Sequence, residues 1–182
     1  MKSKQISLIF CMVIMLAACS DTDKNIPEQK VAEYVPDPAQ IYVKALSDKP
    51  AGVPILPQET DPCFLDRVNN QNAIGINVLS DNSKVLLSGW AGDVTNGKSP
   101  QEAWLEFDGI KQDTGFYYIK TASGTKRQDV ADVFKKPGLA DTGWEVFVSL
   151  SDMPGGIYEV HIMMLVEDKW LTCDTKRVIQ IY

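Results

Sequence analysis

The stretch Tyr158-Glu159-Val160-His161-Ile162-Met163-Met164-Leu165-Val166 decides the fold. Its even-numbered positions are all apolar, whereas the odd-numbered ones include a glutamate and a histidine. Side chains alternate between the two faces of a β-strand, so this pattern predicts a strand with one buried face. Residues 144–150 repeat the alternation with Trp, Val, Val and Leu at the even positions. The strand therefore has a neighbour of the same kind.

Further apolar or alternating segments, separated by turn residues, surround these two. The expected strands are 73–79, 84–91, 103–107, 115–120, 144–150, 156–166 and 170–182. The turns between them are rich in Gly, Asn, Asp and Ser, which tolerate tight or left-handed backbone. Strands at this spacing predict a mainly β, antiparallel two-sheet sandwich of immunoglobulin-like type, and a small barrel is the alternative.

Residues 127–134 interrupt the β pattern. Asp129 stands where an N-cap is expected, Asp132 follows three residues later as in a capping box, and a Pro-Gly pair provides a stop. The segment predicts one short helix across an end of the sandwich. A second short helix is expected over residues 37–46, where an Asp-Pro pair could begin it.

The first 18 residues have the parts of a secretory leader: a basic start, an apolar run and small residues before a cut site. The apolar run is shorter than the roughly 20 residues of a membrane-spanning helix. The tetrapeptide Leu16-Ala17-Ala18-Cys19 resembles the lipobox of bacterial lipoproteins, in which the cysteine is lipidated and becomes the N-terminus. An ordinary leader cut after Ala18 is the alternative.

The lipobox resemblance implies a signal peptide over residues 1–18 and a lipid anchor, palmitate or another acyl chain, on Cys19. Several acyl chains on one residue would hold the protein stably on a membrane. In enteric-type lipoproteins an aspartate directly after the cysteine favours the inner membrane, and here that position is Ser20. The resemblance therefore implies the outer membrane, with the protein facing the periplasm.

Proline marks the segment between the leader and the β pattern. Residues 19–62 contain seven of the ten prolines, mixed with charged and polar residues. Proline removes backbone donors and disfavours helix and sheet alike, so this segment predicts a tether. The expected organisation is a signal peptide (1–18), a lipidated Pro-rich tether (19–62) and the sandwich domain (63–182).

The charge balance is acidic, with 18 basic and 24 acidic residues. Removal of the leader takes away two lysines and no acid, which leaves a formal charge of minus eight. This balance argues against nucleic acid or an anionic membrane surface as a partner, because both are recognised mainly by clustered Lys and Arg.

The cysteines divide by position. Cys11 lies in the leader and Cys19 in the lipobox, which leaves Cys63 and Cys173 in the folded part. Outside the cytoplasm a disulfide between these two is expected. Two free buried thiols are the alternative.

Four short motifs in the β region occur in a recognisable order. They are Gly89-Trp90-Ala91, Arg127-x-Asp129-Val130-Ala131, Gly143-Trp144 and Pro154-Gly155-Gly156-x-Tyr158. This order resembles that of Ig-like modules in secreted and envelope-associated bacterial proteins. The resemblance covers about residues 85–166 and implies a fold, with no catalytic residue to carry over.

Residues suited to catalysis or metal binding are sparse. The one histidine, His161, lies on the polar face of the strongest strand, which favours a packed or solvated residue over a catalytic base. No Cys, His or carboxylate cluster has metal-ligand spacing, and the loop aspartates match no calcium loop, so we expect no metal or other cofactor. Paired carboxylates can meet from anywhere in a fold, so a glycosidase stays open.

Two features suggest binding. Phe116, Tyr117 and Tyr118 are consecutive on an expected strand, so at least one ring faces away from the core and could stack on a sugar, anchor a partner or be covered by a loop. Arg127 could clamp a ligand anion or pair with a nearby acid to fix its corner. The sequence thus predicts a non-enzymatic, lipid-anchored module that binds a protein or glycan of the cell envelope. The alternatives are an enzyme acting on polysaccharide or peptidoglycan through paired carboxylates, and a structural subunit of an envelope assembly.

Overall fold

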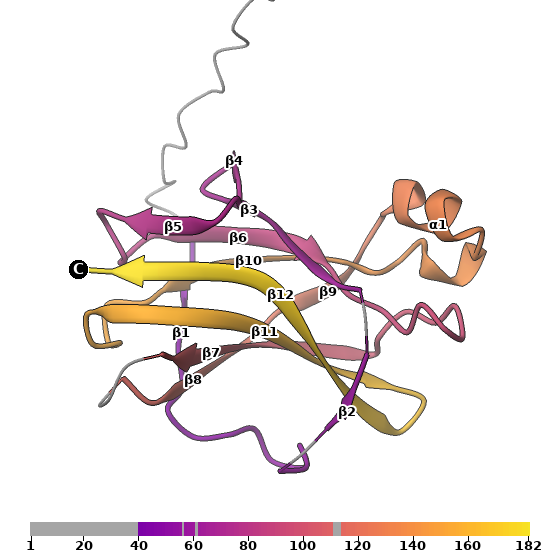
Figure 1. The fold of residues 1–182 in the computed structure, drawn as a ribbon, viewed down its shortest axis with the longest axis horizontal. Coiled ribbons are helices and arrows are strands. Elements are labelled where there is room, and N and C mark those ends of the chain that lie inside the picture. The colour runs from indigo at the N-terminus through magenta and orange to yellow at the C-terminus, as the bar shows by residue number, and fades with distance from the viewer. Residues whose placement is uncertain (1–39, 56, 61, 111–113) are drawn as a thin grey trace, which may run out of the picture. The chain divides into compact units, whose positions relative to one another are not determined.

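The computed structural model describes residues 40–182 apart from 56, 61 and 111–113. These residues form two β-sheets and the short helix α1, Gln128–Phe134, which a 3-10 turn at Pro137–Leu139 follows (Figure 1). The predicted mainly β, two-sheet fold with one short helix is confirmed. The lipobox and the first part of the expected tether lie outside the described residues.

The first sheet, sheet A, has the strand order β1-β10-β6-β3-β4, and β9 also pairs with β10. Its strands are β1 (Val43–Lys44), β3 (Phe64–Val68), β4 (Gln71–Asn72), β6 (Val85–Trp90), β9 (Ala122–Thr125) and β10 (Gly143–Ser149). All pairs are antiparallel except β1 with β10, which is parallel.

The second sheet, sheet B, has the strand order β2-β12-β11-β7-β8, and β5 also pairs with β12. Its strands are β2 (Gln58–Glu59), β5 (Ile76–Leu79), β7 (Glu102–Gly109), β8 (Phe116–Lys120), β11 (Gly156–Val166) and β12 (Lys169–Ile181). β2 and β5 run parallel to β12, a departure from the expected all-antiparallel arrangement. Each is short and adds to the edge of a long antiparallel ladder.

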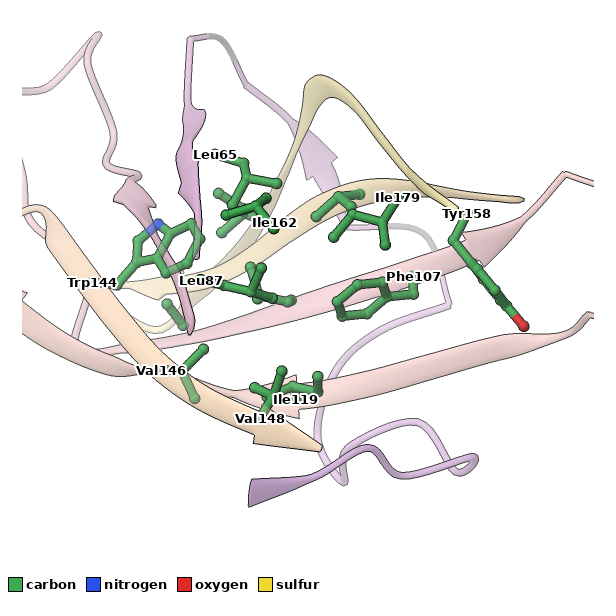
Figure 2. Packing of buried hydrophobic residues seen from close by; sticks show 14 of the residues in the cluster. Leu65, Leu87, Phe107, Ile119, Trp144, Val146, Val148, Tyr158, Ile162 and Ile179 are labelled. Carbon is green, nitrogen blue, oxygen red and sulfur yellow. The ribbon is translucent and has the colours of Figure 1, made fainter. Parts of the chain in front are cut away.

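The core lies between the sheets and follows the alternation seen in the sequence. Every even-numbered residue from Tyr158 to Val166 is buried, and so is every even-numbered residue from Trp144 to Leu150. Figure 2 shows Trp144 and Tyr158 at opposite ends of the packed side chains. Burial of large apolar side chains from both sheets, at about 1.5–3 kcal/mol each, is the main stabilising term.

The disulfide between Cys63 and Cys173 is confirmed. Cys63 precedes β3 of sheet A and Cys173 lies within β12 of sheet B, with their Cα atoms 6.1 Å apart. The bond therefore joins the two sheets across the core.

The sequence pattern missed β3. Leu65 and Val68 are its buried residues, and they are three positions apart because Asp66 forms a β-bulge between Leu65 and Arg67. A bulge adds one residue to a strand and breaks the two-residue period. The short exposed strand β9 was missed too, since it has no apolar face.

The prediction of a helix over residues 37–46 was wrong for the part that is described. Val43 and Lys44 instead form β1, which pairs with Val148 and Ser149. The edge of β10 offers backbone donors and acceptors there, and this pairing overrides weak helix propensity. β1 and β2 both belong to the sheets, although they lie in the segment expected as tether.

The predicted cap of α1 was also wrong. The N-cap residue is Arg127, with no side-chain cap bond, and Asp129 lies in the first helical turn. The Asp129 carboxylate binds the Arg127 guanidinium instead. The helix ends at Phe134, and the C-cap residue Lys135 has left-handed backbone (φ 53°) and donates its N–H to carbonyls of the last turn. Over the described ranges, no helix has the length and apolar character needed to cross a bilayer.

Candidate binding site

A cavity of about 660 Å³ opens beside β3. Its walls come from both sheets: β3, β4 and the turn between them, β6, β9 and β10 in sheet A, and β12 in sheet B. Residues 73–74, Arg127 at the start of α1 and Asp129 in its first turn complete the lining. Sites for small molecules commonly measure about 300–1,000 Å³. The cavity is therefore large enough for a small ligand or the end of a larger one.

The β-bulge in β3 places Asp66 at the cavity. Leu65 pairs with Gly89 and Arg67 pairs with Ser88, so Asp66 is the extra residue between them. Bulges commonly re-aim a side chain next to a functional site. The Asp66 carboxylate accepts a hydrogen bond of 2.6 Å from Nη1 of Arg127.

Arg127 is held on two sides. In addition to the Asp66 bond, its Nε and Nη2 donate to the two carboxylate oxygens of Asp129 at 2.9 and 2.7 Å. Such two-bond pairing is the strongest form of arginine–carboxylate contact. The bonds that Arg127 donates to Asp129 raise the pKa of Arg127 and lower the pKa of Asp129.

Gly143 makes room for this arginine. A Cβ at that position would lie 2.8 Å from Cγ of Arg127 and 2.6 Å from the carbonyl oxygen of Thr125. The Arg127 side chain therefore crosses the strand at a point that only glycine allows, and the two acids then fix its guanidinium. This arrangement matches the structural role weighed for Arg127 from the sequence.

Trp144 lies on β10 and is 2% exposed. Its indole passes over Gly89, where a Cβ would lie 2.7 Å from Cζ2 of the ring and 2.0 Å from the carbonyl oxygen of Phe64. The indole Nε1 is buried and has no hydrogen-bond partner among the described residues. A buried donor left unsatisfied costs about 1–3 kcal/mol.

Arg177 reaches the same cavity from sheet B. It pairs with Val160 on β11, whose side chain is fully buried, so Arg177 also faces sheet A. The register between β11 and β12 shifts next to it, so that Thr175 and Lys176 are extra residues on β12, and Lys176 adopts φ 57°. The Arg177 Nη1 donates to the Lys176 carbonyl at 3.2 Å. Its Nε, like the Trp144 indole, is buried without an acceptor in the described part of the chain.

The charges around the cavity balance. Three arginines and three acids line it: Arg67, Arg127, Arg177, Asp66, Asp129 and Glu145. Two of the acids are bound by one arginine, Arg127. The lining is thus neutral overall, but its charges are unevenly paired.

The predicted aromatic residues lie elsewhere. Tyr117 faces the core, where its ring meets Tyr158 edge-on at 6.1 Å, and Phe116 is 50% exposed. Tyr118 is buried, and the backbone of Leu46 bonds to it in both directions. Burial and the adjacent Glu106 raise the pKa of Tyr118 to about 12. Phe116 is therefore the ring of the three that remains exposed, and Arg127 is the one predicted binding residue that reaches the cavity.

His161 lies on the outer face of sheet B, between two acids. It pairs in register with Glu106 on β7 and Asp174 on β12, and its Nε2 is 3.9 Å from a carboxylate oxygen of Glu159. Burial raises the pKa of Glu106. No group of three or more His, Cys, Asp or Glu side chains is arranged for a metal ion within the described ranges.

Sequence reasoning missed Asp66, Trp144 and Arg177 as cavity residues. Asp66 gave no signal, because a bulge has no period. Arg177 did give one, since it occupies an inward position in the series Leu171, Cys173, Thr175, Arg177, Ile179 and Ile181. An arginine in such a series is a buried charge by pattern, and a buried charge needs a partner.

Comparisons with known proteins add no relative: no protein-family model matches the sequence, and no match is found among curated proteins or solved structures.

Proposed function

We propose that this protein is a lipid-anchored lipoprotein of the cell envelope and that its sandwich is a non-enzymatic module that binds an envelope component. The observation that carries the proposal is the cavity beside β3. It has the size of a small-molecule site, and both sheets contribute polar groups to it. Arg127 with its two partners Asp66 and Asp129, called the Arg127 corner below, contributes further polar groups. Its walls are held together by the disulfide between β12 and the residue before β3.

The leader and the lipobox support the envelope location, with lipid on Cys19 and the outer membrane, facing the periplasm, as the expected place. The disulfide fits this proposal, because such bonds persist in oxidising compartments and are rare in the cytosol. The ligand is a protein segment or glycan of the envelope. The acidic balance of the chain argues against nucleic acid.

The acids of the cavity favour binding over hydrolysis. A glycosidase needs one carboxyl group with a raised pKa to donate a proton. At the cavity, Arg127 bonds to both Asp66 and Asp129, and it lowers the pKa of Asp129. Both acids therefore hold an arginine, and Asp129 is a poor proton donor.

The alternative, an enzyme acting on polysaccharide or peptidoglycan through paired carboxylates, has one observation in its favour. Glu106 has a raised pKa, and Asp108 follows it on the same face of β7. A hydrolysis assay on isolated peptidoglycan, with Glu106→Gln as the comparison, separates the two functions. Release of soluble fragments by the native protein but not by the variant would favour the enzyme.

The anchor is tested by substitution of Cys19. Cys19→Ala should move the protein from the membrane fraction to the soluble fraction, because lipid cannot be attached. Cys11→Ala, which removes the other leader-side cysteine, should leave the protein in the membrane fraction. Retention of the Cys19→Ala protein on the membrane would contradict the lipoprotein assignment.

Binding at the cavity is tested by photo-crosslinking in living cells. A photoreactive residue replaces Ile74, which borders the cavity, or Val133 on α1, which does not. Both side chains are 74% exposed, so the two positions are matched. A discrete envelope product from position 74 alone supports the proposal. Equal products from both positions, or none from position 74, would overturn it.

A further inference from the structure

Two buried N–H groups without acceptors belong to residues that line the cavity from opposite sheets. The Trp144 indole comes from β10 and the Arg177 guanidinium from β12, and both residues line the same space. They are the buried side-chain nitrogens that lack a partner over residues 40–182 as described. Folded proteins pair nearly all such groups, so two together at one cavity indicate a binding role.

We infer that the cavity receives a carboxylate of the ligand, which accepts hydrogen bonds from Nε1 of Trp144 and Nε of Arg177. The inference rests on the proposed binding function and names the chemical group that is recognised. A carboxylate is an acceptor only, with two oxygens that can take bonds from two donors at once. Bonds between a guanidinium and a carboxylate are among the strongest hydrogen bonds in proteins.

The charge of Arg177 favours an anion over a neutral carbonyl. No Asp or Glu of the described chain forms an ion pair with Arg177, whereas Arg127 forms two. Arg177 also faces the inside of the sandwich, where an unpaired charge is unfavourable. A ligand anion supplies the missing opposite charge.

The acids around the cavity favour a singly charged anion. Asp66, Asp129 and Glu145 all line it, so a phosphate with two charges meets more repulsion than a carboxylate with one. One negative charge on the ligand also matches the single positive charge of Arg177, whose Nε is buried at the cavity lining without an acceptor in the described chain.

The two donors differ in freedom. The Trp144 ring is confined over Gly89, whereas Arg177 is tied to the Lys176 carbonyl by a bond of 3.2 Å at its outer end. Both nitrogens are hidden from solvent, so a small movement of the longer and more flexible arginine admits the carboxylate. The confined indole N–H of Trp144 then fixes the position of the bound carboxylate.

The test is NMR spectroscopy of the full-length, ¹⁵N-labelled protein in detergent micelles, with sodium acetate as the probe. Sodium chloride at equal ionic strength is the control for salt. The chain has four tryptophans, so the indole N–H signals are few, and Trp144→Phe identifies the relevant one. Arg177→Lys identifies the Nε–H signal. We expect saturable shifts of both signals with acetate and none with chloride.

Two variants of equal charge change make the test specific. Arg177→Gln should weaken acetate binding, read at the Trp144 signal, by about ten-fold or more, which is the effect of losing one charge-assisted contact. Lys176→Gln removes the adjacent positive charge outside the cavity and should change binding by less than about two-fold. Absence of acetate shifts, equal shifts with chloride, or full binding by Arg177→Gln would each overturn the inference.

Matched probes then distinguish the source of the carboxylate. N-acetylglycine and its amide represent a peptide end, and glucuronate and glucose represent an acidic sugar. In each pair, only the carboxylate form should shift the Trp144 and Arg177 signals, and the pair with tighter binding identifies the source. Acetate shifts together with failed crosslinking at position 74 would retain this carboxylate site but refute the proposed envelope function. Crosslinking without acetate shifts would do the reverse.

Discussion

Arg127 and Arg177 line the same cavity, but their surroundings differ sharply. Arg127 bonds to Asp66 and Asp129, and its stem crosses the strand at Gly143. Arg177 has no acidic partner in the described chain, and its Nε is buried without an acceptor. One arginine completes its contacts within the protein, whereas the other keeps donor capacity for something else.

The two arginines differ in how much hydrogen-bonding capacity each has left for a ligand. A guanidinium that is held by two acids fixes a corner of the fold and has little left to offer a ligand. A buried guanidinium nitrogen without an acceptor still has donor capacity and is therefore a candidate for contact with a ligand. The arginine that the sequence pattern singled out was Arg127, while the geometry directs attention to Arg177.

The largest expected effect comes from removing the disulfide, which links β12, the strand that carries Arg177, to the residue before β3. Cys63→Ala with Cys173→Ala should lower the free energy of unfolding by about 3–5 kcal/mol, because the bond restricts a long loop in the unfolded chain. The sequence separation of the two cysteines is 110 residues. Urea denaturation measures the loss, and Cys11→Ala should show none. A loss below about 1 kcal/mol would contradict the expected role of the disulfide.

Replacement of each arginine by methionine tests the difference between Arg127 and Arg177. Arg127→Met should lower the free energy of unfolding by about 1–3 kcal/mol, because it leaves the partly buried Asp66 without its donor. Arg177→Met should change it by less than about 0.5 kcal/mol, or raise it by up to about 1 kcal/mol, because it removes an unsatisfied donor. Calorimetry of both variants provides the measurement. Equal destabilisation would mean that Arg177 has a structural partner after all.

The smallest expected effect is the acid dependence of the Arg127 corner. The folded-state pKa of Asp129 is lowered by its bonds from Arg127, so its contribution is full above the unfolded pKa, about 3.9, and is lost as the pH falls through the lower folded value. Asp129→Asn should therefore flatten the loss of stability below about pH 4. The effect is small because the Asp129 side chain is 64% exposed.

Thermal unfolding at a series of pH values checks this expectation. Asp132→Asn, on the same helix, serves as the charge-matched control and should keep the native profile. A native profile in the Asp129→Asn protein would show that the bonds from Arg127 do not stabilise the carboxylate.

Local pattern predicted the regular part of the molecule well. The alternation of β11 and β10 predicted both strands and their buried faces, and the short helix lies within the segment 127–134 where it was expected. These predictions succeeded because burial on one face imposes a two-residue period on the sequence. The pairing of Cys63 with Cys173 followed from the expected compartment.

Local pattern failed at the start of α1 and over residues 37–46. The expected N-cap at Asp129 was wrong because Arg127 competes for that carboxylate. The expected helix over residues 37–46 was wrong because β10 had an open edge for Val43 and Lys44. At Asp129 the competing partner is the side chain two residues earlier, and at Val43 and Lys44 it is a distant strand. Each outweighed a local preference of about 1 kcal/mol.

The sequence by itself determined the β class, the main strands and the short helix. Only the tertiary structure decided that Asp66 meets Arg127 across 61 positions and that Trp144 and Arg177 line one cavity. The physical reason is that side-chain periodicity is set by each strand alone, whereas the position of a bulge and the register between sheets depend on packing of the whole core.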